Sequence, residues 1–304
     1  MLHGLLLINK PSGITSHDVV ARVRKILGTK SVGHTGTLDP MASGLMVLLI
    51  GEATKLSQYI LEQNKAYRLK ALLGKTTDTL DITGQVLTTS DKTVDSQLVS
   101  EQALRLSGPI ELPVPIYSAA KVDGKKLYEY ARQEQEVRIP MKTMTFFDLN
   151  IESQTANEIE VSMRCSKGSF VRSWVSRLGE ILGVGAVMSA LIRTESMPYH
   201  LENAITLEEL ETLKDQEQFR GFIPMVSTLP AAPIVRIKGQ DQVMMGNGLI
   251  SHGLKSQLIG AYRPGQQDSV IKIIAQGTGE LLALVGMEIG KGFVVRRVFR
   301  YDSV

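Results

Sequence analysis

A carboxylate in a glycine-rich segment is the first residue whose surroundings suggest chemistry. Asp39 precedes Pro40 within the segment GHTGTLDPMASG, residues 33–44. Glycines allow sharp turns or a close approach of the backbone to a ligand, and proline restricts the backbone beside the carboxylate. The segment therefore predicts a loop of defined shape that presents Asp39. A connecting turn in which Asp39 caps a neighbouring amide fits the same residues.

Other patterns that could carry chemistry fail on their context. The segment 74–76 (GKT) lacks the glycine that a phosphate-binding loop needs five positions earlier, where Leu69 stands. The glycines of 183–185 are followed by Met188, where a dinucleotide fingerprint needs glycine or alanine. The histidines have no metal-ligand spacing, and Cys165 is the only cysteine. We therefore expect no nucleotide cofactor and no metal.

The composition excludes several protein classes. Of the 304 residues, 43% are hydrophobic and 21% are charged, which is an ordinary globular mix. The longest uncharged apolar stretch, residues 40–51, is well short of the ~20 residues that span a bilayer. A single cysteine cannot form an internal disulfide, which favours a reducing compartment. The sequence thus predicts a cytoplasmic protein without a membrane span.

Charge is distributed unevenly along the chain. Residues 1–75 carry 10 basic and 4 acidic side chains, residues 76–235 carry 15 and 22, and residues 236–304 carry 9 and 5. Two basic ends could form one positive face toward a polyanion, because local potential steers such partners. Solvated lysines scattered over the surface explain the same counts.

Hydrophobic periodicity predicts the elements of the first part of the chain. A strand is expected within residues 1–10, followed by a helix from Thr15 or Ser16 to a stop at Gly28. The apolar run of residues 44–50 predicts a strand buried on both faces. We expect a loop over residues 31–43 and a helix over residues 52–62.

Alternation returns in the middle of the chain. Residues 66–73 predict a strand with Tyr67 on its inward face, and residues 158–165 predict another. The second strand breaks at residues 166–169 and leads into an amphipathic helix that carries Arg172 near its start. Further helices are expected at residues 97–107, 126–133 and 207–215, the last capped by Thr206.

The chain ends in a region of different pattern. The proline-rich segment 224–233 is the best candidate linker. Beyond it, residues 270–274, 281–285 and 293–298 are short strand-like runs separated by glycines. These runs predict a small β-rich module of about 65 residues.

The sequence resembles the TruB family of tRNA pseudouridine synthases over about residues 4–193. The segment around Asp39 looks like the catalytic-aspartate motif of that family. The other matching segments follow in the family order: KPSGITS (10–16), GEATK (51–55), KAY (65–67), TDTLD (77–81), YSAAK (117–121) with Gly124, LYE (127–129) and CSKGSFVR (165–172).

The resemblance implies an α+β fold, with a mixed, mainly antiparallel central sheet flanked by helices. It implies a catalytic pseudouridine synthase domain over residues 1–232. Residues 236–304 are similar to a PUA-type RNA-binding domain in position, size and strand content.

The resemblance also implies catalytic roles for three residues. Asp39 takes the part of the nucleophile, and Tyr67 stacks on an extruded base and serves in the proton shift from C5. Arg172 keeps Asp39 charged through a buried ion pair, because an adjacent guanidinium lowers the pKa of a carboxyl. A core aromatic and an exposed helix-start arginine are the plainer readings of Tyr67 and Arg172.

Five further residues match family positions that bind substrate. His34 would brace the gap left by the extruded nucleotide, Phe170 and Leu191 would line the pocket, and Lys55 would stand at its charged rim. Phe170 stands where the family often has tyrosine. Asp81 also matches. Their plainer readings are a backbone-bonded loop residue for His34, core packing for Leu191, a solvated lysine for Lys55 and a turn cap for Asp81.

The resulting hypothesis is an isomerase that converts uridine to pseudouridine at position 55, in the T-arm loop of tRNA. The expected partner is the T-arm stem-loop, and we expect a monomer with no cofactor and no obligate protein partner. One alternative is a catalytically silent tRNA-binding or folding protein. A second is a glycosidase that uses Asp39 and Asp81 as a carboxylate pair.

Overall fold

Strand β3 (Ser43–Ile50) is buried on both faces, as its continuous apolar run predicts. Its even-numbered residues from Met46 to Ile50 pack into one apolar cluster, and its odd-numbered residues from Leu45 to Leu49 pack into a second. Two layers of the molecule therefore cover the sheet at this strand.

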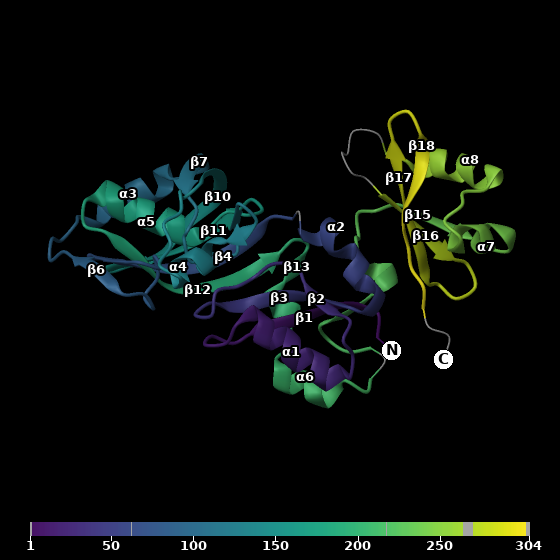
Figure 1. Ribbon diagram of the computed structural model, residues 1–304, viewed down its shortest axis with the longest axis horizontal. Coiled ribbons are helices and arrows are strands. Elements are labelled where there is room, and N and C mark those ends of the chain that lie inside the picture. The colour runs from purple at the N-terminus through teal and green to yellow at the C-terminus, as the bar shows by residue number, and fades with distance from the viewer. Residues whose placement is uncertain (1, 62, 217, 264–269, 302–304) are drawn as a thin grey trace.

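The computed structural model describes residues 2–61, 63–216, 218–263 and 270–301. Within these ranges a mixed sheet runs through the molecule (Figure 1), antiparallel throughout except where β12 runs parallel to β3. Short strands β2 (Val32–His34) and β13 (Tyr199–His200) pair with β3 and β12. The main path is, in spatial order, β14 (Phe222–Pro224), β1 (Gly4–Lys10), β3, β12 (Ala186–Ser196), β4 (Lys65–Leu73), β11 (Glu158–Cys165), β10 (Met141–Gln154) and β7 (Gly108–Pro113).

Helices flank this sheet, so the expected α+β architecture is confirmed. Helix α1 contacts α6, and α5 packs on β12 and contacts α3. No helix in the described ranges is long and apolar enough to cross a bilayer. The helices are α1 (Ser16–Leu27), α2 (Ser57–Leu61), α3 (Ser96–Arg105), α4 (Leu127–Arg132), α5 (Val171–Leu182) and α6 (Leu207–Leu213), with short 3-10 turns η1 (Gly51–Leu56), η2 (Leu201–Asn203) and η3 (Met225–Ser227).

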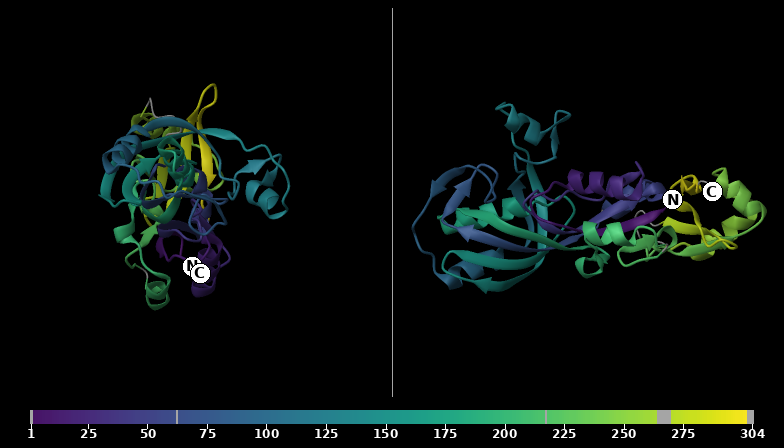
Figure 2. Two further views of the ribbon diagram at one scale, coloured as in Figure 1. Left: turned by 90° about the vertical axis from the view of Figure 1, so that its left-hand side faces the viewer. Right: turned by 90° about the horizontal axis from the view of Figure 1, so that it is seen from below.

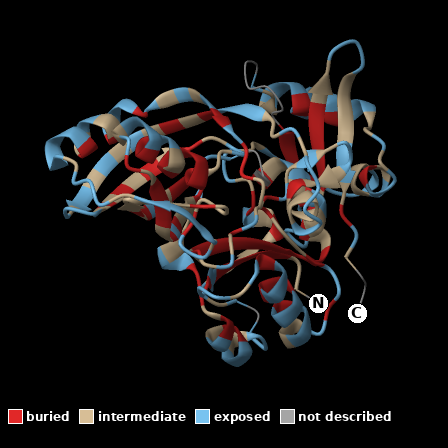
Figure 3. Cartoon of the chain, turned by 60° about the vertical axis from the view of Figure 1, so that its left-hand side comes forward, coloured by how far each residue is buried: buried red, intermediate tan, exposed pale blue. Residues whose placement is uncertain are grey.

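The last part of the chain forms its own four-stranded sheet, as the β-rich pattern predicts, together with two helices that the pattern did not reveal. Leu281 and Leu284 of this sheet join Leu5, Leu7 and the odd-numbered face of β3 in one apolar cluster. In Figure 3 buried residues gather on the strands of both sheets. The elements are β15 (Ile234–Ile237), α7 (Gln240–Gly246), α8 (His252–Ala261), β16 (Val270–Ala275), β17 (Leu281–Glu288) and β18 (Gly292–Val298).

Two small hairpins lie outside the main sheet. One pairs β5 (Lys75–Thr77) with β6 (Val86–Thr89). The other pairs β8 (Lys121–Val122) with β9 (Lys125–Lys126) and continues into α4. Both views of Figure 2 show this second hairpin and α4 as an arm that stands away from the sheet.

Local signals locate most element boundaries correctly. Thr15 forms a capping box with Asp18, and α1 stops at Gly28 in the left-handed conformation. The helix expected over residues 52–62 is instead η1 followed by short α2; residue 62 lies outside the described residues. The loop expected over residues 31–43 contains β2.

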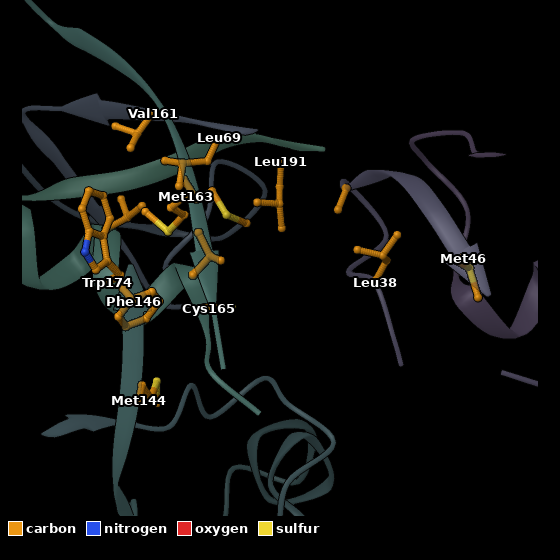
Figure 4. Packing of buried hydrophobic residues seen from close by; sticks show 14 of the residues in the cluster. Leu38, Met46, Leu69, Met144, Phe146, Val161, Met163, Cys165, Trp174 and Leu191 are labelled. Atoms are coloured by element: carbon orange, nitrogen blue, oxygen red, sulfur yellow. The ribbon is translucent and has the colours of Figure 1, made fainter. Parts of the chain in front are cut away.

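The main apolar cluster is centred on α5. Trp174 is fully buried, donates its indole N–H to the Leu106 carbonyl at 2.9 Å and packs near Phe146. Figure 4 shows these rings beside Met163 and Leu69 of the sheet. The helix that carries Arg172 is thereby fixed against the strands.

Gly179→Ala should destabilise the protein. A Cβ on Gly179 would lie 2.1 Å from the Ala186 amide nitrogen, so α5 would have to move off β12. We expect a loss of about 1–3 kcal/mol in the free energy of unfolding, as for an overpacked core. Urea denaturation measures this loss.

Gly260→Ala in α8 is the matched control. A Cβ there meets nothing within 4 Å. Alanine is the better helix former, so this change should leave stability unchanged or raise it by about 0.5–1 kcal/mol. Equal effects of the two substitutions would contradict the packing described for Gly179.

Candidate active site

Asp39 lies in the loop between β2 and β3, and Lys10 at the end of β1 holds this loop. The Lys10 ammonium donates to the carbonyls of Pro40 (3.2 Å) and Ala42 (2.5 Å). Its side chain is buried, and burial lowers the pKa of the ammonium to about 8, while the charge of Asp39 opposes that shift. Lys10 thus fixes the backbone that presents the carboxylate.

The segment after β1 braces the same loop from another side. Ser16 Oγ donates to the Leu38 carbonyl at 3.0 Å and accepts from the Leu38 amide at 2.8 Å. The Gly13 amide donates to the Pro40 carbonyl at 2.8 Å. Residues 10–16 and the aspartate loop therefore form one structural unit.

Arg172 forms a two-pronged ion pair with Asp39. Its Nε lies 3.0 Å from Oδ2 and its Nη2 lies 3.1 Å from Oδ1. The guanidinium also donates to the carbonyls of Thr79 and Tyr117, each at 2.9 Å. The side chain is only 5% exposed, so the reading of Arg172 as an exposed helix-start arginine is wrong. This fork fixes the orientation of the carboxylate.

The acidity of Asp39 differs from the expectation. Burial raises the pKa of the Asp39 carboxyl, and the charge of Asp81 adds to the rise. Arg172 opposes it, by charge and by hydrogen bonding, in the expected direction. The net direction expected from the ion pair alone is therefore wrong, because desolvation of the carboxyl outweighs the arginine.

Asp81 lies beside Arg172 but is not among the residues that line the cleft described below. Its Oδ1 accepts from Thr79 Oγ1 at 2.9 Å and from the Thr83 amide at 3.0 Å. Its Oδ2 is 3.9 Å from Arg172 Nη1, and its side chain is 7% exposed. Asp81 thus accepts the hydrogen bonds of its own turn and also lies beside the Arg172 guanidinium.

A cleft of about 440 Å³ opens at the Asp39–Arg172 pair. Tyr67 of β4, Phe170 at the start of α5 and Leu191 of β12 all line it. Figure 4 shows Leu191 together with Leu38 of the aspartate loop, and both residues line the same cleft. The structure therefore brings together three apolar or aromatic residues that the resemblance assigns to the site.

His34 stands at the end of β2 and is not among the lining residues of the cleft. Its Nδ1 accepts from the Gly36 amide at 3.3 Å, which is the backbone contact of its plainer reading. Burial lowers the pKa of the imidazole, and the charge of Arg193 lowers it further. The neutral ring is therefore favoured in the folded protein.

Lys55 lies in a different part of the molecule from Asp39. It sits in η1, 2.6 Å from Glu52 Oε2, and its ammonium is 3.5 Å from the Val298 carbonyl of β18. It lines a second hollow, together with Arg296 and Arg297. The structure thus separates Lys55 from the cleft.

The described residues hold no cluster of histidine, cysteine, aspartate or glutamate that could bind a metal ion. Cys165 lines the cleft as a buried thiol, and burial raises its pKa to about 12. Asp39 is therefore the strongest nucleophile candidate in the cleft.

Two family models match adjoining parts of the chain. Residues 24–171 match the N-terminal domain of TruB family pseudouridylate synthases, and residues 172–228 match a tRNA pseudouridylate synthase B C-terminal domain. The tRNA pseudouridine synthase B of Bdellovibrio bacteriovorus is 55% identical over 302 residues, 99% of this chain and 98% of that protein. The chain belongs to the TruB family of pseudouridylate synthases.

More distant relatives agree with this assignment. The tRNA pseudouridine synthase B of Alkaliphilus oremlandii is 42% identical and covers 83% of this TruB-family chain and 85% of its own length. A chain of an H/ACA RNP bound to a substrate RNA has a TM-score of 0.72 at 22% identity, covering 98% of this chain and 86% of that one. A chain of a Cbf5-Nop10-Gar1 complex has a TM-score of 0.70 at 23% identity, covering 98% and 85%. The two structures share the fold.

Two residues that shape this TruB-family site were not foreseen, one in the cleft and one beside it. Arg193 of β12 is 3% exposed and lines the cleft, but it lies in a strand that the sequence pattern did not reveal. Lys10 matched the family motif, yet its spacing carried no sign that its ammonium would reach residues 40–42. A lysine at the end of an apolar strand was the only available signal.

The stability contributed by Lys10 should depend on pH. Its pKa is about 8 in the folded protein and 10.5 ordinarily, so between these values the unfolded chain binds more protons. Relative to Lys10→Met, the wild type should therefore gain stability as pH rises through this window, by on the order of 2 kcal/mol. Urea denaturation at several pH values measures the difference.

Lys25→Met is the control, because Lys25 is exposed on α1. Its stability difference from the wild type should stay flat over the same window. A flat or falling difference for Lys10→Met would contradict the buried charge described for Lys10.

Proposed function

We propose that this protein converts uridine to pseudouridine at position 55, in the T-arm loop of tRNA, with Asp39 as the nucleophile. The observation that carries the proposal is the two-pronged Asp39–Arg172 pair at a cleft lined by Tyr67, Phe170 and Leu191. Relatives that match nearly the whole chain bear the name tRNA pseudouridine synthase B, which supports tRNA as the substrate.

The reaction needs only groups that the cleft supplies. The N1–C1′ bond breaks, the base turns and a C5–C1′ bond forms, so no atom is lost and no net oxidation occurs. The Asp39 carboxylate can assist covalently or electrostatically at the sugar or the base. After the new bond forms, C5 loses its proton and N1 gains one. Tyr67 is the lining residue placed to accept the C5 proton.

The shape and charge of the cleft suit one extruded nucleotide. A volume of about 440 Å³ lies within the usual range of ligand pockets. Aromatic and aliphatic side chains can stack on the base, which offsets the few kcal/mol that unstacking costs. Among the described lining residues Asp39 is the one acid, whereas five are basic: Lys65, Lys142, Lys167, Arg172 and Arg193.

The remaining matched residues act around this centre. Asp81 acts through Arg172, on whose opposite edge it lies. His34 braces the RNA loop from the rim, next to the aspartate loop. A glycosidase that uses Asp39 and Asp81 as a facing pair is not favoured, since Asp81 is not among the described lining residues.

The C-terminal module provides a second contact with tRNA. We assign the catalytic domain to residues 1–232 and a PUA-like domain to residues 236–304. Lys55, Arg296 and Arg297 line a hollow between η1 and β18, where phosphates of the stem can bind. The protein works in the cytoplasm as a monomer without an obligate protein partner.

Asp39→Asn tests the catalytic assignment. With an unmodified tRNA transcript, pseudouridine formation in the T-arm should fall by about 10³-fold or more, because the amide is a poor nucleophile. Binding of the tRNA should stay within a few fold. Chemical labelling maps pseudouridine, and filter binding measures affinity.

Asp91→Asn, at an exposed loop aspartate, is the control and should match the wild type. Wild-type protein that makes no pseudouridine in the T-arm would overturn the proposal. Wild-type protein that refolds tRNA without isomerising it, with Asp39→Asn equally active in refolding, would point to the silent tRNA-binding protein. Release of a free base would point to a glycosidase.

Replacing Arg296 and Arg297 by alanine tests the second contact. Affinity for whole tRNA should fall, and the salt dependence of binding should weaken by about one unit of slope for each phosphate that is no longer neutralised. Turnover of an isolated T-arm stem-loop should not change. Arg177→Ala, at an exposed arginine on α5, is the control. An equal fall in affinity for tRNA and for the stem-loop would contradict a separate binding surface.

A further inference from the structure

Arg193 stands directly opposite Tyr67 in the sheet. The two residues are partners in the antiparallel β12–β4 pair, so their side chains leave the same face. A β-bulge follows between Arg193 and Glu195, a device that re-aims side chains beside functional sites. Both residues line the cleft, and Arg193 is buried.

The guanidinium of Arg193 holds the aspartate loop and the start of β3. Its Nε donates to the Leu45 carbonyl at 2.6 Å, and its Nη2 donates to the Gly36 carbonyl at 3.2 Å. Its backbone packs on Gly44, where a Cβ would lie only 2.4 Å from the Arg193 carbonyl oxygen. One arginine therefore holds β3 and the loop that carries Asp39, while its partner across the strands is the phenol.

The groups around the Tyr67 phenol determine how readily it loses its proton. Tyr67 is faced by Arg193 from β12, Cys165 from β11 and Asp39 from its loop, with Lys65 on its own strand. Burial raises the pKa of the phenol, and Asp39 and Cys165 raise it further. Arg193 opposes the rise by its positive charge.

We propose that Arg193 is a positioning residue, which fixes the aspartate loop against β12 and presents its positive charge to the Tyr67 phenol across the strands. The proposal rests on the function proposed above. The phenol first releases its proton to water, and the phenolate then takes the proton from C5. The electrons of the C5–H bond restore the C5–C6 double bond of the ring, and N1 takes a proton from solvent.

The test is the pH dependence of single-turnover isomerisation in Arg193→Gln and Arg193→Lys, from pH 6 to about pH 9.5. Loss of the cation should displace the rising limb to higher pH by about one unit. Because the phenol pKa lies above this range, Arg193→Gln should be roughly tenfold slower throughout it. The loss should vanish in a Tyr67→Phe background, which has no phenol for the cation to act on. Arg193→Lys keeps the charge and should show a smaller displacement.

Arg164→Gln is the matched control. Arg164 lies on the neighbouring strand β11, partly exposed and paired with Glu195 at 2.8 Å, and it is not among the lining residues. It loses the same charge and should keep the wild-type profile. A displaced profile in this control would show a general effect of net charge and would overturn the proposal.

The remaining outcomes distinguish the role proposed for Arg193 from the proposed function of the protein. A rate loss from Arg193→Gln that is just as large in the Tyr67→Phe background would mean that Arg193 is only structural. If circular dichroism shows that Arg193→Gln does not fold, the same criterion applies to Arg193→Lys. Wild-type protein without pseudouridine formation would overturn the proposed function itself, whereas a normal wild type with unshifted variants would overturn only the role of Arg193.

Discussion

The site depends on the contact between a carboxylate at the mouth of a cleft and a guanidinium that is removed from bulk water. A buried charge is costly unless a partner and hydrogen bonds compensate it. Arg172 meets this requirement with two contacts to Asp39 and one to each of the carbonyls of Thr79 and Tyr117. Segments far apart in sequence must therefore converge on one side chain before the cleft exists.

The sheet makes this convergence rigid. Strand β12 lies between β3 and β4, parallel to the first and antiparallel to the second. Leu191 and Arg193 of β12 are thereby set between the aspartate loop that precedes β3 and Tyr67 on β4. On the other side of the cleft, α5 is anchored by buried Trp174 and carries Arg172 at its start. The groups that would act on the base thus sit on elements that cannot move independently.

Sequence reasoning succeeds where the cause is local. The capping box at Thr15, the glycine stop of α1 and the strict alternation of β11 are all readable over a few residues. Strands β10 and β12 were missed because bulges interrupt their alternation. Asp39, Tyr67, Phe170, Arg172 and Leu191, which the resemblance assigns to one site, line the same cleft.

Contacts between residues far apart in the chain could not be predicted from the sequence. Arg172 and Asp39 are 133 positions apart, so neither their contact nor its depth can be read from spacing. The direction of the Asp39 pKa was mistaken for this reason, because desolvation depends on what covers the carboxyl. Lys55 matched a motif but lies at another hollow. A motif match does not determine where a side chain lies in the folded protein.

The apolar cluster shared by β1, β3 and the C-terminal strands has a consequence for how this chain can vary. Leu5, Leu7 and the odd-numbered face of β3 share this cluster with residues such as Leu56 and Met225, and Leu281 and Leu284 join it from the C-terminal sheet. A chain cut near residue 232 would expose the part of the cluster that the C-terminal strands now bury, and exposed apolar patches favour aggregation. The C-terminal strands therefore contribute to the core of the enzyme. A shorter relative would need other apolar residues to cover this part of the cluster.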